Sequence, residues 1–335
     1  MSLARAETRR LYKRRFTKLV LLGVLLVLGA TVAGTWFSNE KVTPAQVADA
    51  KAQADRDYQT SLQSAQQDQQ KCQAAQGTAD AANWPPGCEG LYTPQPEDFN
   101  YVWYMPASFE FVEEFPDMIS VLAVVLAAAA FLIGASFVGA EWNSGGMMNL
   151  LLWRPQRLRV LGTKMFVFLG WLISWTVVLT AVWAGVFRVI AETRGSTEKL
   201  TSGAWQSIGL MGLRGLGMVV AAGALGFAMA SLGRHTGMAL GALIGLGALQ
   251  IGVYVMAQLA GLKYPEAYLA PLWGFAWLYK EFVVQDYNSC DFSTSSGCEY
   301  ATFTLTWQVA GIGMAIFALL VVGTSMWTMR RRDIT

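Results

Sequence analysis

The sequence predicts an all-α integral membrane protein with six transmembrane helices and a helical, disulfide-bearing outer loop between the first and the second. Three observations lead to this fold class. The 335 residues are 54% hydrophobic and only 14% charged, a composition too apolar for a soluble protein. Six apolar stretches are long enough, at about 1.5 Å per residue, to cross about 30 Å of hydrocarbon. Lys and Arg are unevenly distributed among the segments between these stretches.

The six stretches define the expected division of the chain. The predicted spans are 19–36, 118–140, 165–187, 211–232, 237–259 and 306–326. No other apolar run of comparable length remains in the sequence. The long segments 37–117 and 261–304 are therefore expected to be loops. The first run has basic residues before it but no small-residue cleavage site after it, which favours an uncleaved helix over a signal peptide.

Basic residues predict the orientation of these spans. They gather in the segments 1–18, 141–164 and 327–335, so these segments and both termini are expected in the cytoplasm. Segment 37–117 is instead rich in acids, and we expect it outside together with 261–304. Segment 1–18 mixes apolar and basic side chains, which is typical of an amphipathic helix at the inner lipid interface. A nucleic-acid-binding tail is the alternative, but no recognition motif supports it.

The two outer loops have their own predicted features. Residues 42–76 are rich in Ala and Gln and should form an outer helix. Residues 264–284 are apolar but interrupted, which favours a re-entrant or interfacial helix over a seventh span. The four cysteines lie in these loops, two in each, so we predict the local disulfides Cys72–Cys88 and Cys290–Cys298, with four free thiols as the alternative.

The stretch from Glu141 to Lys164 lies between the second and third spans and has a distinctive order of residues. An acid closes the preceding helix, and Ser144-Gly145-Gly146 breaks it. Residues 147–153 can form about two helical turns, which Arg154-Pro155 ends. This order resembles the loop between the second and third spans of ABC-2 type transporter permeases, and the number of spans and the loop plan extend the resemblance more loosely over the chain.

The resemblance implies a function and a set of partners. The chain would be the permease subunit of a bacterial ABC exporter in the plasma (inner) membrane, with an amphiphilic drug, lipid or peptide as cargo. A second permease copy and two ATPase subunits would complete the assembly, with ATP and Mg²⁺ on the ATPase. The resemblance places the contact with the ATPase on Glu141, Ser144, Gly145, Gly146, Met147, Leu151, Arg154, Pro155, Arg157 and Lys164.

Catalytic and cofactor motifs do not occur in the chain. The phosphate-binding pattern GxxxxGK[ST], the zinc pattern HExxH and the nucleophile pattern GxSxG are all absent. His235 is the only histidine in the sequence, and no second ligand type lies near it. We therefore interpret it as a plain loop residue rather than a catalytic or metal-binding one. We therefore expect no enzyme activity, no bound metal or cofactor and no nucleic-acid partner. The rival function is a non-transporting membrane receptor or sensor, in which segment 37–117 binds a ligand.

Three further patterns leave alternatives open. Gly237, Gly241 and Gly245 form consecutive GxxxG steps, which suit helix packing in a bundle or a dimer, or a hinge. Arg214, near the outer end of its span, either has a functional role or extends toward the headgroups. Glu141 needs compensation at the end of a membrane helix. Arg154, Arg157 and Lys164 are its candidate partners, with the N-terminal arginines, an ATPase side chain or interfacial water as alternatives.

Overall fold

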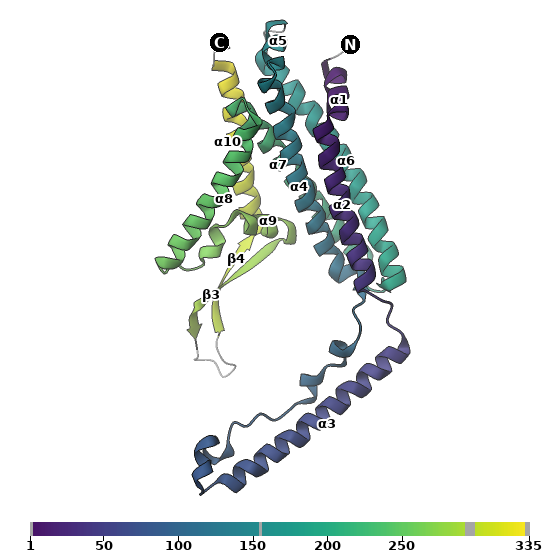
Figure 1. Ribbon diagram of the computed structural model, residues 1–335, viewed down its shortest axis with the longest axis vertical. Helices are drawn as coiled ribbons and strands as arrows, with labels where there is room; N and C mark the ends of the chain where they lie inside the picture. The colour runs from purple at the N-terminus through teal and green to yellow at the C-terminus, as the bar shows by residue number, and fades with distance from the viewer. Residues whose placement is uncertain (1–2, 154–155, 292–298, 332–335) are drawn as a thin grey trace. The chain divides into compact units, whose positions relative to one another are not determined.

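The computed structural model describes residues 3–153, 156–291 and 299–331, and it is mainly helical (Figure 1). The chain forms two compact units. The first, which we call the bundle unit, comprises Met1–Val32, Val112–Phe187 and Lys199–Thr335. The second, which we call the disulfide unit, comprises Ala33–Phe111 and Arg188–Glu198.

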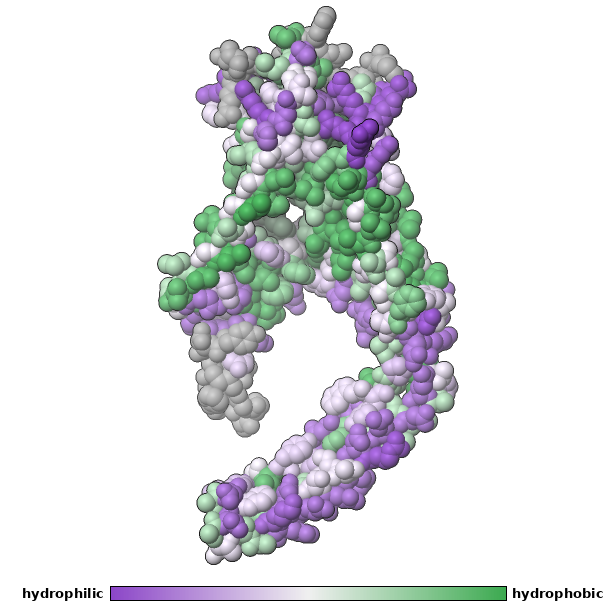
Figure 2. Space-filling view, viewed as in Figure 1, coloured by the Kyte–Doolittle hydropathy of each residue, from purple (hydrophilic) through white to green (hydrophobic). Residues whose placement is uncertain are grey.

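Six helices are long and apolar enough to cross a membrane. They are α2 (Arg15–Ser38), α4 (Phe111–Asn143), α6 (Arg157–Arg194), α7 (Ser202–Gly233), α8 (Thr236–Leu259) and α10 (Trp307–Arg331). They confirm the six predicted helices, although several run beyond the predicted apolar stretch into polar residues. Apolar side chains cover the middle of the bundle unit in Figure 2, as expected of a multi-pass membrane protein.

Close backbone contact between α4 and α7 forms the centre of the bundle unit. A Cβ atom on Gly134 of α4 would lie 2.5 Å from the carbonyl oxygen of Gly223 in α7, and one on Gly226 would lie even closer to the carbonyl of Phe131. The rings of Phe137, Phe168 and Phe227 stack beside this contact at centroid distances of 6.1 and 6.3 Å. Small residues therefore bring α4 and α7 together, and the aromatic rings add α6 to the same core.

Two short helices lie at one end of the bundle unit, α1 (Leu3–Lys13) and α5 (Gly146–Trp153). Figure 1 shows them at the same end as the last turns of α10. Helix α5 confirms the short helix predicted at 147–153. It is separated from α4 by a turn in which Gly145 has φ +69°, a conformation that glycine adopts without strain.

The segment between α8 and α10 contains η5 (Pro265–Tyr268), α9 (Ala270–Tyr279) and the strands β3 (Glu281–Asp291) and β4 (Glu299–Thr306). Helix α9 forms part of the helix predicted at 264–284, but residues 281–284 belong to β3 instead, and its placement in a membrane interface stays a prediction. The antiparallel pairing of β3 with β4, from Glu281 opposite Thr306, was not predicted. The all-α fold class therefore describes the bundle but not this hairpin, whose strands carry β-branched and aromatic residues.

Arg214 of α7 joins three elements of the bundle unit. Its guanidinium donates a hydrogen bond of 3.0 Å to the carbonyl of Leu278 in α9 and lies 5.5 Å from the ring centroid of Trp307 in α10. The indole of Trp277 donates in turn to the carbonyl of Arg214. The side chain is thus held by α9 and α10, which differs from the interpretation in which it simply extends toward headgroups.

The disulfide unit is built on α3 (Pro44–Ala75), which confirms the helix predicted at 42–76, while its location outside the cell stays a prediction. Thr43 and Gln46 form a capping box at its start. The chain returns along α3 through η1 (Ala79–Asn83), η2 (Pro86–Cys88), η3 (Pro96–Phe99) and η4 (Tyr101–Tyr104). Tyr58 packs on Phe99, and Lys51 lies over the ring of Tyr101. The returning loop therefore covers the apolar positions of α3.

Two further contacts stabilise the disulfide unit. Cys72 and Cys88 form a disulfide with a Cα–Cα distance of 5.9 Å, which confirms the first predicted pair. The strand β1 (Phe109–Glu110) pairs in parallel with β2 (Gly195–Ser196). The second predicted pair, Cys290–Cys298, involves a residue and a side chain outside the described part of the chain.

Candidate functional site

Three helix ends bring charged residues together in the bundle unit. Glu141 lies in the last turn of α4, and Lys164 lies two turns into α6. Glu7 lies on the face of α1 that packs into the bundle, together with the fully buried Leu11 one turn later. Because the α4 helix ends two residues after Glu141 and α6 starts seven residues before Lys164, the two side chains meet at one level of the bundle.

The ammonium group of Lys164 lies between two carboxylates. Its Nζ atom is 2.8 Å from Glu7 Oε2 and 2.7 Å from Glu141 Oε2. The exposed fractions of the three side chains are 0% for Lys164, 1% for Glu7 and 9% for Glu141. Both contacts are short enough for ion pairing but lack the alignment of hydrogen bonds. The cation is therefore held mainly by electrostatic attraction in a site that excludes water.

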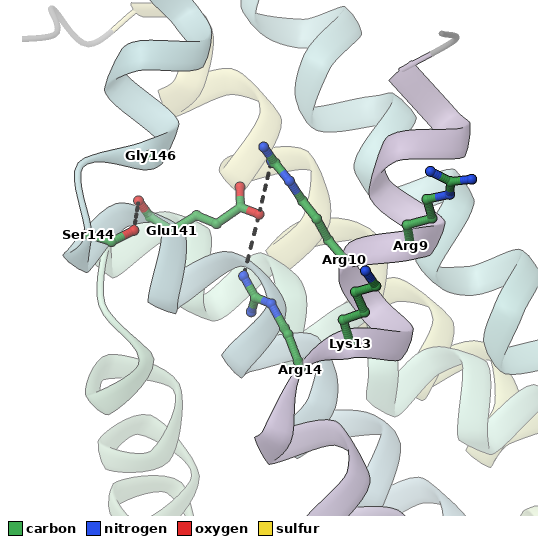
Figure 3. A pocket seen from close by; sticks show the side chains of 7 residues that line it. All are labelled: Arg9, Arg10, Lys13, Arg14, Glu141, Ser144 and Gly146. Atoms are coloured by element: carbon green, nitrogen blue, oxygen red, sulfur yellow. Dashed lines mark hydrogen bonds and ion pairs between the residues drawn. The ribbon is translucent and has the colours of Figure 1, made fainter.

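Two arginines surround these acids. Arg14 Nη2 lies 3.4 Å and Arg10 Nη1 lies 3.7 Å from Glu141 Oε1, and Arg10 Nη1 also lies 3.4 Å from Glu7 Oε1. Arg14 donates a second hydrogen bond, of 2.8 Å, to the carbonyl of Ser136. Figure 3 shows both arginines directed at Glu141. We call Glu7, Arg10, Arg14, Glu141 and Lys164 the charge cluster.

Two cations of the charge cluster pack against one aromatic ring. The guanidinium of Arg14 and the ammonium of Lys164 each lie 5.3 Å from the ring centroid of Phe137. Burial lowers the pKa of Arg14 from its usual value, while the nearby Glu141 and Glu7 oppose this effect. An arginine remains charged even so. Because buried ion pairs add little net stability but are costly to break, the cluster ties α1, α4 and α6 into one arrangement.

The structure thus selects among the predicted partners of Glu141. Lys164 and the N-terminal arginines contact it, whereas Arg154 and Pro155 lie outside the described residues and Arg157 begins α6 two turns before Lys164. Glu7 was not among the predicted partners, because the apolar and basic side chains of segment 1–18 indicated an interfacial helix and its one acid was not considered. A lone acid placed four residues before Leu11 on the buried face of a basic helix was the available signal.

The predicted contact residues of the 144–151 region have two different roles. Ser144 donates its hydroxyl to the carbonyl of Glu141, and Gly145 and Gly146 form the turn into α5. Met147 and Leu151, which the resemblance assigns to the ATPase contact, are both buried within the chain. Met148 and Leu152 instead face outward, with exposed fractions of 40% and 81%. These two residues, four apart, form the free apolar edge of α5.

Two of the glycines in the predicted steps of α8 pack against nothing in the part of the chain that the structure describes. Cβ atoms on Gly241 and Gly245 would meet nothing within 4 Å, whereas one on Gly237 would meet the His235 ring. His235 caps α8, because its Nδ1 accepts a 2.8 Å hydrogen bond from the Gly237 N–H. Of the earlier alternatives for Gly241 and Gly245, the structure therefore leaves a contact with another chain or a hinge.

Comparison with protein-family models, with curated proteins and with solved structures finds no significant match for this chain. Within residues 3–153, 156–291 and 299–331, no group of three His, Cys, Asp or Glu side chains is placed to hold a metal ion. The charge cluster, the α5 edge and the α8 glycines are therefore the features from which a function can be argued.

Proposed function

We propose that this chain is the permease subunit of an ATP-driven ABC transporter, similar to ABC-2 type permeases. In this proposal it exports an amphiphilic drug, lipid or peptide, and separate ATPase subunits bind ATP and Mg²⁺. The observation that carries it is the free apolar edge of α5. Exposed Met148 and Leu152 project from a helix on which Met147 and Leu151 are buried. Such a helix can receive a partner on one side and transmit its movement on the other.

Transmission would pass through the ends of α4 and α6. The turn at Gly145 joins α5 to α4, and the ion pair of Glu141 with Lys164 joins α4 to α6. Glu7 adds α1 to the same group. When two ATPase subunits close on each other, a push on α5 would tilt these helices together between inward-facing and outward-facing arrangements, a two-state change biased by nucleotide.

The assembly we propose contains two permease copies in the bacterial plasma membrane, with both termini in the cytoplasm. The open faces of Gly241 and Gly245 on α8 support close packing against a second copy. The position of α1 and the last turns of α10 at the same end of the bundle supports an even number of crossings (Figure 1). The basic residues of those segments then favour the cytoplasmic side.

Affinity purification tests the proposal directly. The tagged chain is isolated from membranes of its own host, and bound proteins are identified by mass spectrometry. We expect an ATPase without membrane spans, and we expect Leu152→Glu to release it while Leu152→Met retains it, because only the first places a charge on the apolar contact. Purification without any ATPase, or full retention by Leu152→Glu at wild-type abundance, would contradict the proposal.

The receptor alternative also has an observation in its favour. Tyr92 and Trp103 of the disulfide unit are 64% and 70% exposed, and such aromatic side chains are common in binding surfaces. If the protein is a receptor, Leu152→Glu would leave ligand binding unchanged, whereas Trp103→Ala would abolish it.

A further inference from the structure

A hollow of about 450 Å³ opens beside the charge cluster in the bundle unit (Figure 3). One wall is formed by α1 and the link to α2, and the opposite wall by the turn between α4 and α5. The lining residues are Arg9, Arg10, Lys13, Arg14, Glu141, Ser144 and Gly146. Four of the seven are cations and one is an acid, so the hollow is strongly electropositive.

The single acid in this lining is already engaged. Glu141 Oε2 contacts Lys164, and its Oε1 contacts Arg14 and Arg10. Arg9 and Lys13 have no acidic partner within the described residues, and Figure 3 shows them without an ion pair. Five cations, counting Lys164, face only two carboxylates, Glu7 and Glu141, which leaves three positive charges uncompensated. The hollow therefore favours an anion carrying more than one acceptor oxygen.

The opposite wall adds backbone donors. Gly146 is the first residue of α5, and the first N–H groups of a helix have no intrahelical acceptor. The N–H of Ser144, in the turn before α5, is instead bonded to the carbonyl of Ala140. The helix dipole attracts negative charge at this end. Cationic side chains on one side and helix-start amides on the other form a combination suited to phosphate oxygens.

We propose that this hollow binds a phosphate group, and that the phosphate belongs to the headgroup of an anionic phospholipid. The position of the hollow in the bundle favours a lipid headgroup over a free phosphate. It lies where α2 begins, α4 ends and α6 begins, which is the level at which apolar helices meet the headgroup layer. Basic pockets between membrane helices at that level suit anionic lipids. The proposal does not depend on the transporter function, because it requires only that the six helices lie in a bilayer.

Native mass spectrometry of the full chain in an uncharged detergent tests this proposal. The purified protein is titrated with phosphatidylglycerol, with phosphatidylcholine as the neutral-headgroup reference. We expect one phosphatidylglycerol per chain to be retained, with affinity at least about tenfold above that for phosphatidylcholine, since each cation near a headgroup contributes measurably. Equal affinity for the two lipids would overturn the proposal.

Matched variants separate the hollow from general surface charge. Arg9→Gln/Lys13→Gln removes two hollow-lining cations that pair with no acid among the described residues, and Arg5→Gln/Lys18→Gln removes two exposed cations of the same segment outside the lining. We expect the first pair to lose phosphatidylglycerol by about tenfold or more and the second by less than about twofold. Equal losses would show diffuse attraction and overturn the site.

A competition arm identifies the source of the phosphate. Inorganic phosphate at millimolar concentration should leave the bound phosphatidylglycerol in place, because the acyl chains add affinity that free phosphate lacks. Displacement by inorganic phosphate would overturn the lipid assignment and show that the hollow takes a free phosphate. Loss of a co-purifying acidic protein in Arg9→Gln/Lys13→Gln, with lipid binding unchanged, would overturn the proposal in favour of a protein partner.

Discussion

Replacing Lys164 by Met removes the cation that separates two buried carboxylates. Glu7 Oε2 and Glu141 Oε2 contact the same Nζ atom, so they lie no further apart than the sum of the two contacts, about 5.5 Å. At an effective dielectric constant of about 20, two unit charges at that separation repel by about 3 kcal/mol. Breaking a buried ion pair on one side typically costs about 3–5 kcal/mol. We therefore expect Lys164→Met to lower the free energy of unfolding by about 3–5 kcal/mol.

The assay is equilibrium unfolding of the detergent-purified protein, followed by tryptophan fluorescence. Glu7→Gln is combined with Lys164→Met to remove one charge of each sign, and we expect the double variant to recover about 2 kcal/mol because the carboxylate repulsion is gone. Arg188→Gln is the matched control. It breaks an exposed pair with Glu192 and should cost at most about 0.5 kcal/mol. A loss below about 1 kcal/mol for Lys164→Met, or strictly additive effects in the double variant, would refute the reasoning.

Three other results are expected. Gly134→Leu should prevent stable folding, because its Cβ would meet the α7 backbone. Gly241→Leu should leave the monomer stable and weaken self-association, as measured by light scattering. Unchanged association would leave the hinge as the explanation for Gly241. Cys72→Ser/Cys88→Ser should lose about 3 kcal/mol of local stability and expose residues 77–87 to proteases, while equal cleavage of both proteins would count against a stabilising role. In a cysteine-free background, a cysteine at Ser144 should resist a membrane-impermeant reagent applied to intact cells and one at Trp103 should react, and the reverse pattern would invert the proposed topology.

Much of the helical architecture was predictable because it follows from local properties. The cost of placing polar groups in hydrocarbon makes each apolar run of sufficient length a helix, whatever it packs against. The glycines before α5 and Pro44 at the start of α3 act within a few residues of their position. Cys72 and Cys88 are 16 residues apart and linked by a loop, so their pairing was also a local inference.

The hairpin of β3 and β4 was harder to predict from the sequence. Residues 281–286 and 301–306 are short and mix apolar with polar residues. The first segment overlaps the end of the helix predicted at 264–284, and the second leads into the span predicted at 306–326, so neither pattern indicates a strand. Only the pairing of the two strands satisfies their backbone groups, and pairing is a property of two segments together.

The candidate site depended most on the tertiary structure. The sequence alone predicted that Glu141 and Lys164 lie at the ends of helices apolar enough to cross a membrane and that residues 147–153 form a short helix between them. The tertiary structure decided that Glu7, more than a hundred residues away, completes the cluster, and that Met148 and Leu152 rather than Met147 and Leu151 remain free. It also placed the close glycine contact between α4 and α7 instead of on α8. The physical reason is that hydropathy and helix termination are summed over neighbouring residues, whereas the face a helix buries and the partner a charge finds depend on the packing of distant segments.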